Sequence, residues 1–535
     1  MRGKSAVRLS ARLMLALPVM ALVGGCAGQL PAAGTGVAPA QVWRSDQGDG
    51  TYLNPPLNAD YPDPDIIRVG EDFYFVSTTF ANVPGLTLLH SRDLVNWEIL
   101  SHVVTRLEGR PQYDLADGGA YRAGVYAPSL RHRDGTFYVA VTPVGQSTRI
   151  YQARDPRGPW TFVELGQELF DPALFFDEDG TSYLASAIGS DGTITLHTLN
   201  ENVSRITSSR VVHYYQGAEG SKIIKRGGWY YLFNSIPRRL GMTVSRARNL
   251  FGPWETRSSI DDTTGGHQGA LVDLPNGEFY GFVMLDAGAK GRVTNISPVF
   301  WREGWPIWGT PDAPDQVPAR APKPITGHPF REPPASDTFD SGRLGLQWQW
   351  NHNPLNDLWS LSDRPGWLRL KAAPGDQLWW ASNTLVQKGQ APGGRGEVVV
   401  DASGIRPGDV CGFGTFGKYS GQLAITGQPD GSRALTMRVT EATEQGPVVD
   451  TRVAAEPITT DRLWLRTDMS FTSDRATLSY SLDGQRFVPL GGEVPLVYDW
   501  RTGTFQGVQF ALSCYNPGAG GGYMDVDQFT LTALP

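Results

Sequence analysis

The sequence predicts an all-β protein in which a five-bladed β-propeller is followed by a β-sandwich. Two observations lead to this fold class: a turn-and-strand unit that recurs five times, and alternating strands after a proline-rich connector. The 63 glycines and 39 prolines agree, because they favour short strands joined by tight turns over helical bundles. The length of 535 residues suits two or three domains. A net charge of −7 without a basic stripe argues against nucleic acid as a partner.

The N-terminal segment has the features of an export signal. A positive start precedes an apolar run from Leu13 to Val23, which is too short for an ordinary membrane span. "VGGC" resembles a bacterial lipoprotein cleavage box, so residues 1–26 are predicted to be a secretion or lipoprotein signal ending at Cys26, and cleavage without lipidation is the alternative. Residues 27–45 are predicted to be a flexible tether. We therefore expect an exported protein, in the bacterial periplasm or on the outer membrane, with a lipid on Cys26 as its only membrane attachment.

The recurring unit is a turn followed by an apolar strand with a tyrosine at a fixed place. The five tyrosines are Tyr74, Tyr138, Tyr183, Tyr231 and Tyr280, about 45 to 64 residues apart. Strand-rich units with a period of this size are typical of propeller blades, so residues 46–312 are predicted to form five of them.

Each turn implies a hairpin whose first strand begins about a dozen residues before the tyrosine. Counting back to that entrance gives Asp63, Tyr126, Asp171, Glu219 and His267. The innermost strands of a propeller line its central channel, so these side chains are expected to converge at one mouth.

Three carboxylates in one small cavity favour chemistry. Crowding of like charges should raise the pKa of one carboxyl so that it keeps its proton. A protonated acid facing an ionised carboxylate is the equipment for cleaving a glycosidic bond. Calcium binding is the rival use of such a cluster, and structural packing is the other alternative. Pro62 and Pro64 restrict the backbone on both sides of Asp63, which would position that carboxylate in advance.

Four sequence blocks resemble the recurring blocks of glycoside hydrolase family 43. They are "NPPLNADYPDPDIIRVGEDFYFVSTTF", "LFDPALFFDEDG", "GAEGSKIIKRGGWYYLF" and "HQGALVDLPNGEFY". The resemblance implies a five-bladed propeller that acts with inversion on sugars derived from xylan and arabinan. Carried over by position, it implies that Asp63 is the general base, Glu219 the general acid and Asp171 the residue that tunes pKa and orients.

The same resemblance implies a set of binding residues. Arg292 would contact substrate near the base, Tyr126 and Phe80 would form the sugar-binding walls, and His267 would orient water or bind calcium. No cofactor is expected to be required, and a structural calcium held through water near His267 is the one metal site suggested.

Four further aspartates near these positions are predicted to have local roles. Asp60 and Asp65 are predicted to cap turns, and Asp177 and Asp179 to lie in a hairpin turn.

The second half of the chain is predicted to be a separate domain. Residues 313–335 form a proline-rich connector and residues 336–535 a β-sandwich, which resembles the lectin-like, concanavalin A-like domain of many family members. The resemblance implies a loop from this domain that closes the pocket. Cys411 and Cys514 could pair. Four tryptophans could either stack on sugar rings or pack in the core, and core packing is favoured. They are Trp348, Trp350, Trp379 and Trp380.

We therefore expect an inverting hydrolase that releases xylose, arabinose or both from the ends of hemicellulose-derived oligosaccharides, with β-xylosidase activity foremost. The alternatives are α-L-arabinofuranosidase as the main activity, a catalytically silent sugar-binding lipoprotein, and a retaining hydrolase of the fructan-cleaving kind.

Overall fold

The computed structural model describes residues 41–260, 266–443, 446–518 and 521–534. The predicted signal, Cys26 and most of the tether lie outside these residues. The described chain is built from β-strands, and its helical segments are short 3-10 turns: η1 (Pro111–Asp114), η2 (Gly189–Asp191), η3 (Pro237–Arg239), η4 (Gly288–Lys290), η5 (Asn356–Leu358) and η6 (Leu378–Trp380). Within the described ranges, no helix is long and apolar enough to cross a membrane.

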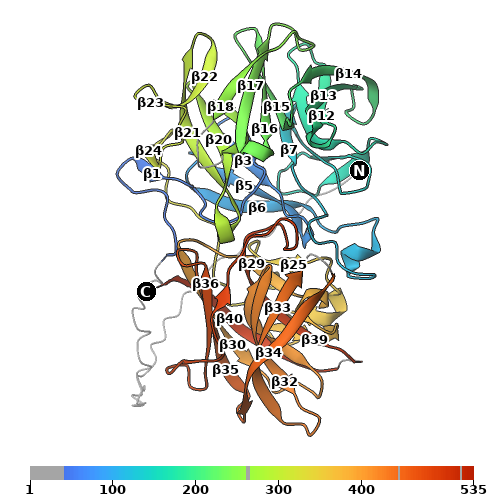
Figure 1. Ribbon diagram of the computed structural model, residues 1–535, viewed down its shortest axis with the longest axis vertical. Helices are drawn as coiled ribbons and strands as arrows, with labels where there is room; N and C mark the ends of the chain where they lie inside the picture. Colours follow the sequence, from blue (N-terminus) through green and yellow to red (C-terminus); the bar gives the residue numbers. More distant parts are fainter. Residues whose placement is uncertain (1–40, 261–265, 444–445, 519–520, 535) are drawn as a thin grey trace, which may run out of the picture. The chain divides into compact units, whose positions relative to one another are not determined.

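Five antiparallel sheets follow one another along the chain, from blue to yellow in Figure 1. Blade 1 contains β2 (Asp65–Val69), β3 (Asp72–Ser77), β5 (Gly85–Ser91) and β6 (Trp97–Val104). Blade 2 contains β7 (Ser129–Arg133), β8 (Thr136–Val141), β9 (Arg149–Ala153) and β10 (Thr161–Glu164). Blade 3 contains β11 (Phe170–Phe176), β12 (Ser182–Ala187), β13 (Thr193–Leu199) and β14 (Ile206–Tyr214). Blade 4 contains β15 (Glu219–Arg226), β16 (Trp229–Ile236), β17 (Gly241–Ala247) and β18 (Glu255–Ile260). Blade 5 contains β19 (His267–Asp273), β20 (Phe279–Asp286), β21 (Arg292–Arg302), β22 (Trp305–Thr310) and β23 (Ala313–Pro314).

The five blades close into a ring. The first strand of each blade contacts the first strand of the next, and β19 of blade 5 contacts β2 of blade 1. All five recurring tyrosines lie on the second strand of their blades, paired with the inner strand. The prediction of a five-bladed propeller is therefore confirmed. β1 (Thr51–Leu53) pairs with β24 (Arg320–Pro322), so the chain before the first blade meets the chain after the last.

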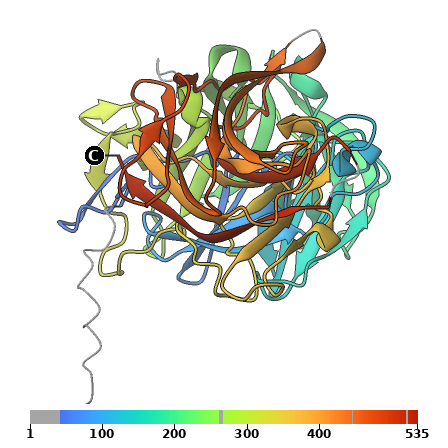
Figure 2. The same ribbon diagram turned by 90° about the horizontal axis from the view of Figure 1, so that it is seen from below.

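The sandwich consists of two large antiparallel sheets whose curved strands are orange and red in Figure 2. One sheet has the order β34 (Gly446–Ile458), β33 (Arg433–Thr443), β32 (Tyr419–Gly427), β31 (Val410–Phe416), β39 (Gln509–Asn516), β29 (Leu385–Lys388), β25 (Gln349–Asn351) and β4 (Asn82–Val83), with β28 (Ala373–Pro374) beside β39. The other has the order β26 (Trp359–Ser360), β27 (Leu368–Lys371), β40 (Tyr523–Ala533), β30 (Gly393–Asp401), β35 (Arg462–Ser470), β36 (Arg475–Ser481) and β37 (Val488–Pro489), with β38 (Val494–Pro495) beside β36.

The sandwich core follows from strand periodicity. On β35, buried and less buried residues alternate, and Leu463, Leu465 and Met469 join one apolar cluster with residues from the facing sheet. Three of the four tryptophans are core residues, because Trp348, Trp350 and Trp379 are 2%, 4% and 2% exposed, and the fourth is half-buried.

One strand of this sandwich comes from the propeller. β4, between the second and third strands of blade 1, pairs with β25, so that Val83 lies opposite Trp350 and Asn82 opposite Asn351. The ladder of backbone hydrogen bonds is therefore continuous between the two halves of the chain at this point.

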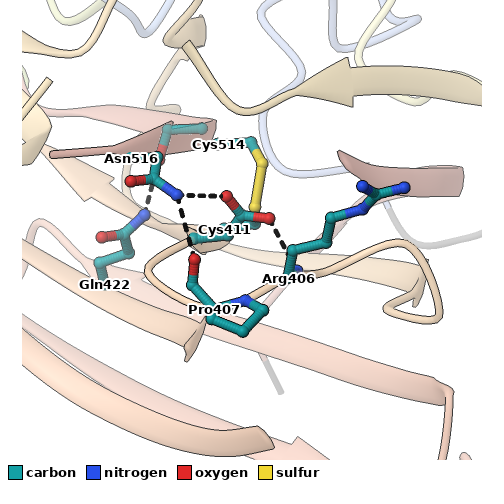
Figure 3. The surroundings of a disulfide bond; sticks show 8 residues. Arg406, Pro407, Cys411, Gln422, Cys514 and Asn516 are labelled. Atoms are coloured by element: carbon teal, nitrogen blue, oxygen red, sulfur yellow. Dashed lines mark hydrogen bonds between the residues drawn. A yellow bond between two sulfur atoms is a disulfide. The ribbon is translucent and has the colours of Figure 1, made fainter. Parts of the chain in front are cut away.

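A disulfide joins two neighbouring strands of the first sandwich sheet. Cys411 on β31 and Cys514 on β39 are direct partners in register, with their Cα atoms 3.9 Å apart. Beside them, the buried carboxylate of Asp409 accepts hydrogen bonds from the Arg406 N–H at 2.8 Å and from Asn516 Nδ2 at 2.7 Å (Figure 3). The two cysteines, whose pairing the sequence left open, are therefore bonded within the sandwich core.

Candidate active site

Every inner strand of the propeller is preceded or opened by one residue in left-handed backbone conformation. These residues, with their φ angles, are Asp63 (52°), Ala127 (47°), Asp171 (48°), Gly220 (57°) and Gln268 (51°). Aspartate and glycine adopt this conformation more readily than most residues, and such backbone is found at functional sites. The five blades are therefore equivalent at their entrances.

The predicted site residues do not all occupy the same place in this pattern. Asp63 and Asp171 are themselves the left-handed residues, whereas Tyr126, Glu219 and His267 come directly before them. The expectation of five equivalent positions is therefore wrong by one residue in three blades. Register shifts in the strand pairing do not account for the offset, because they occur in blades 3, 4 and 5, whereas the offset occurs in blades 2, 4 and 5.

Asp63 is held by an ion pair and by its own backbone. Arg292 Nη1 lies 2.8 Å from Asp63 Oδ1, Arg292 Nη2 lies 3.3 Å from Oδ2, and both side chains are buried. The Asp63 N–H donates to Met284 Sδ at 3.1 Å. Burial alone would lower the pKa of Arg292, but the charge of Asp63 raises it above its usual value, so the guanidinium stays positive. Arg292, which was predicted to contact the substrate, is therefore the ion-pair partner of Asp63 in this structure.

Electrostatic coupling brings the three predicted carboxylates together. Burial raises the pKa of Asp171 well above its ordinary value, and the charges of Glu219 and Asp63 raise it further. The Gly220 N–H, which donates to Asp171, opposes this shift only in part. Burial also raises the pKa of Tyr126, and the same three carboxylates add to that shift. Blades 1, 3 and 4 therefore supply one shared cluster, and a raised pKa within it agrees with the expectation from crowded charges.

His267 is satisfied by protein partners. Its Nδ1 lies 3.2 Å from Ser235 Oγ and its Nε2 lies 3.1 Å from Asp286 Oδ1. Burial would raise the pKa of Asp286, but the hydrogen bond from His267 lowers it below its ordinary value. Among the described residues, no group of three or more His, Cys, Asp or Glu side chains could hold a metal ion. One imidazole and one carboxylate do not match the six to eight oxygens that calcium prefers, so we derive no step through calcium and its binding stays a prediction.

An aromatic wall of the site comes from the sandwich. Phe505 lies in the loop between β38 and β39, and its ring stacks on Phe80 at 4.8 Å. The guanidinium of Arg292 lies 4.6 Å from the Phe505 ring and 5.5 Å from the Phe80 ring. Tyr126 contacts the other side, with its ring 5.9 Å from that of Phe80. A sandwich loop therefore contacts the predicted site residues Phe80 and Arg292, and its closure of the pocket stays a prediction.

Comparison with known proteins identifies the family. The model for "Glycosyl hydrolases family 43" matches residues 52–306, and that for "Beta xylosidase C-terminal Concanavalin A-like domain" matches residues 336–532. A β-xylosidase of Formosa agariphila is 31% identical to this chain, over 92% of each protein. The chain belongs to family 43 of the glycosyl hydrolases.

Two further similar proteins have names that give other activities. A non-reducing end α-L-arabinofuranosidase of Bacteroides ovatus is 33% identical, over 60% of this chain and 65% of the relative. A solved family 43 structure engineered to have both endo-xylanase and exo-arabinofuranosidase activity superimposes with a TM-score of 0.84 at 28% identity, covering 90% of this chain and all of the other.

Two aspartates near Asp63 in this family 43 protein bind partners outside their own turns. Asp65 Oδ2 accepts the Leu130 N–H and Arg131 Nη1, both at 2.8 Å, and so joins blade 1 to blade 2. Asp60 Oδ1 accepts the Arg292 N–H at 2.8 Å. The turn-capping interpretation of both residues is therefore wrong, because their partners lie far away in the sequence.

The two aspartates of the blade 3 hairpin differ. Asp179 accepts the Thr181 N–H at 2.8 Å, as expected of a turn residue. Asp177 also contributes to its turn through the Glu178 N–H, but it accepts Lys225 Nζ at 2.8 Å and Tyr230 Oη at 2.6 Å from blade 4 as well. The turn prediction was therefore incomplete for Asp177.

A cavity of about 390 Å³ opens beside the carboxylates and runs over blade 3. Its lining includes Asp171, Tyr126, Glu168, Phe170 and Ile188, of which Ile188 is 61% exposed. A narrower cavity of about 50 Å³ lies between blade 1 and the sandwich and does not include the three carboxylates. The wider cavity is the place next to the site where the rest of a substrate could lie.

Proposed function

We propose that this family 43 protein is an exo-acting, inverting glycosidase that releases xylose, arabinose or both from hemicellulose-derived oligosaccharides, with β-xylosidase activity foremost. The observation that carries the proposal is that the charges of Asp63 in blade 1 and Glu219 in blade 4 both act on the buried Asp171 of blade 3. The similarity to a protein named β-xylosidase over 92% of both chains supports the choice of xylose.

The roles follow from the partners of each carboxylate. The general base must be ionised in order to accept a proton from water, and the Arg292 ion pair favours that form of Asp63. The general acid must be protonated at the start, and the charge of Glu219 acts on Asp171, whose raised pKa favours a proton within the cluster. Asp171 faces both groups, so it adjusts the proton affinity of the acid and helps to orient it.

The proposed reaction is a single displacement. Asp63 removes a proton from a water molecule as that water attacks the anomeric carbon, while Glu219 donates its proton to the leaving oxygen. The sugar is released with inverted configuration, and the two carboxyl groups end with exchanged protonation. The steps need no cofactor. The cavity over blade 3 would take the leaving-group part of the substrate.

The first test measures hydrolysis of 4-nitrophenyl β-D-xyloside and 4-nitrophenyl α-L-arabinofuranoside. We expect turnover of at least the xyloside, and faster turnover of the arabinofuranoside would make that the main activity. Binding of sugars without turnover would favour a silent lipoprotein instead. Proton NMR of the first-formed anomer distinguishes inversion from retention, and a retained anomer would contradict the roles given to Asp63 and Glu219.

The second test isolates the acid. Glu219→Gln should lose nearly all activity on xylobiose but recover much of it on a substrate with an activated leaving group, which needs little protonation. Asp179→Asn, which changes an exposed turn carboxylate in blade 3, is the matched control and should stay fully active. Equal loss on both substrates would mean that Glu219 is not the acid.

We also propose export and lipidation at Cys26, with the protein in the periplasm or on the outer membrane of a bacterium. The "VGGC" box supports this proposal. Incorporation of labelled palmitate into the wild type and its loss in Cys26→Ala is the expected result, and label retained in the variant would contradict it.

A further inference from the structure

We infer that Asp60 is a positioning residue, which ties the sandwich loop over the active site to Arg292 and, through Arg292, to Asp63. The inference rests on the proposed role of Asp63 as general base. Asp60 stands three residues before Asp63 and is 3% exposed, so its carboxylate lies inside the protein, behind the site.

The Asp60 carboxyl group holds two segments of the chain by their backbones. Its Oδ1 accepts the N–H of Arg292, the first residue of β21, at 2.8 Å. The N–H of Gly507, in the sandwich loop that carries Phe505, lies beside the same carboxyl group and lowers its pKa, and both Asp60 Oδ1 and the Gly507 nitrogen border the Cβ position of Gly291, at 2.2 and 2.7 Å. One side chain therefore fixes the start of the strand that supplies the partner of Asp63 and the loop that covers it.

Two glycines permit this close approach. A Cβ on Gly291 would lie 2.2 Å from Asp60 Oδ1, and a Cβ on Gly507 would lie 2.2 Å from the carbonyl oxygen of Lys290. A backbone hydrogen bond of 2.9 Å from the Val508 N–H to the Ala289 carbonyl joins the same two segments. The loop is thus pressed against the start of β21, with Asp60 at the contact.

Positive charges from the propeller and from the sandwich both act on the Asp60 carboxylate. Burial raises its pKa, while the charges of Lys388, on sandwich strand β29, and of Arg292 lower it. Within the described chain, neither Asp60 Oδ2 nor Lys388 Nζ has a hydrogen-bond partner, so the two groups interact through their charges alone. A neutral amide could accept the same backbone hydrogen bonds but would lose this attraction to Lys388.

The consequence is that one buried anion sets the positions of two groups in the pocket. Arg292 pairs with Asp63 by its side chain and with Asp60 by its backbone. Phe505 stacks on Phe80 and faces the Arg292 guanidinium, two residues before Gly507. If the contacts of Asp60 are lost, Arg292 and Phe505 should therefore shift together.

The experiment compares Asp60→Asn with the wild type on 4-nitrophenyl β-D-xyloside across a pH range. We expect kcat/KM to fall about 10- to 100-fold, the size of effect that a small misplacement near the reacting groups produces. We also expect the acidic limb of the kcat/KM profile to move to higher pH, because Asp63 loses a well-placed guanidinium that favours its ionised form. A purely structural role would lower thermal stability without moving that limb.

Asp65→Asn is the matched control. Asp65 is a buried aspartate of the same loop whose partners are in blade 2, so the variant should lower the melting temperature and leave the acidic limb in place. Gly507→Ala is the second variant, which displaces the loop without changing Asp60 and should move the limb in the same direction as Asp60→Asn.

An acidic limb that stays at the wild-type pH in both Asp60→Asn and Gly507→Ala would overturn the inference, as would an equal shift in Asp65→Asn. If Asp60→Asn does not fold, Gly507→Ala alone decides. A wild-type protein that is inactive on both nitrophenyl glycosides contradicts the proposed function itself, whereas an active wild type with an unmoved limb contradicts only the role of Asp60.

Discussion

Buried carboxylates in the two halves of the molecule have different surroundings. In the sandwich, Asp525 is 1% exposed and accepts Arg369 Nε and Nη2, each at 2.8 Å, and Asp409 accepts two N–H donors beside the disulfide. At the propeller mouth, Asp171 faces Glu219 and Asp63, two further carboxylates. Burial next to donors stabilises a fold, whereas burial next to like charge costs stability and is retained where a proton must move.

The largest effect is expected at the mouth of the propeller. Asp63→Asn should lower kcat on xylobiose by about 10³- to 10⁴-fold, because the amide cannot take a proton from water. The variant should still fold, because asparagine has nearly the same shape as aspartate, but it should lose stability, since the buried Arg292 then lies beside a neutral group. Steady-state kinetics and circular dichroism check the two halves of this prediction. Activity within ten-fold of the wild type would show that Asp63 is not the base.

The matching change in the sandwich should lower stability without affecting catalysis. Asp525→Asn should destabilise the protein by about 3–5 kcal/mol, because it leaves two arginines beside a neutral group in place of a buried anion. The kcat of the folded protein should equal that of the wild type, since Asp525 contacts Arg369 and Arg364 and none of the site residues. Denaturant unfolding and kinetics at low temperature give the measurement. A parallel fall in kcat would break the contrast between the two regions.

The contrast also explains which features could be predicted from sequence. The blades were predictable because each hairpin repeats a local pattern, with a tyrosine such as Tyr138 or Tyr231 opposite the inner strand. The convergence of Asp63, Asp171 and Glu219 followed from that repeat and from the symmetry of a propeller. The one-residue offset did not, because a count from the tyrosine does not show which residue adopts the left-handed backbone conformation.

The contacts that cross from one half of the chain to the other had no local signal. Phe505 meets Phe80 across more than 400 residues, and its segment contains nothing that marks it as part of a pocket. Asp60 looks like a turn residue because it precedes Tyr61 and Pro62, yet its partners are Arg292 and a glycine of the sandwich. Such roles depend on how the two domains dock, which residue pattern does not specify.

The disulfide sharpens the comparison within the sandwich. Replacing Cys411 and Cys514 by alanine should lower the free energy of unfolding by about 2–4 kcal/mol, because the bond closes a long loop in the unfolded chain. The sequence separation of 103 residues places it among long loops. Neither cysteine contacts the pocket, so kcat on the nitrophenyl xyloside should not change. The effect is measured by urea unfolding of oxidised wild type and double variant, and an unchanged midpoint would contradict it.

The smallest expected effect is a gain in stability, in the variant Asp171→Asn. The pKa of Asp171 in the folded protein lies above its ordinary value of 3.8. Between pH 3.8 and the raised pKa of Asp171, the folded state binds one more proton than the unfolded state. The free energy of unfolding therefore falls as pH rises through this interval, and it stays lower at higher pH. Asp171→Asn cannot ionise, so it should be more stable than the wild type at neutral pH. The gain should shrink as pH falls through the same interval and vanish below about pH 3.8.

Unfolding in urea at a series of pH values tests this directly, and turnover measured in parallel should fall, because the amide no longer adjusts the proton affinity of Glu219. Asp409→Asn is a fitting control, since that carboxylate accepts two N–H donors and should lose stability at neutral pH instead of gaining it. If Asp171→Asn were also destabilised at every pH, the like-charge cluster would be a stabilising feature, and the distinction between the two kinds of buried carboxylate would fail. A gain confined to the variant at the propeller mouth would mean that the fold gives up stability at the one place where the proposed reaction needs a shared proton.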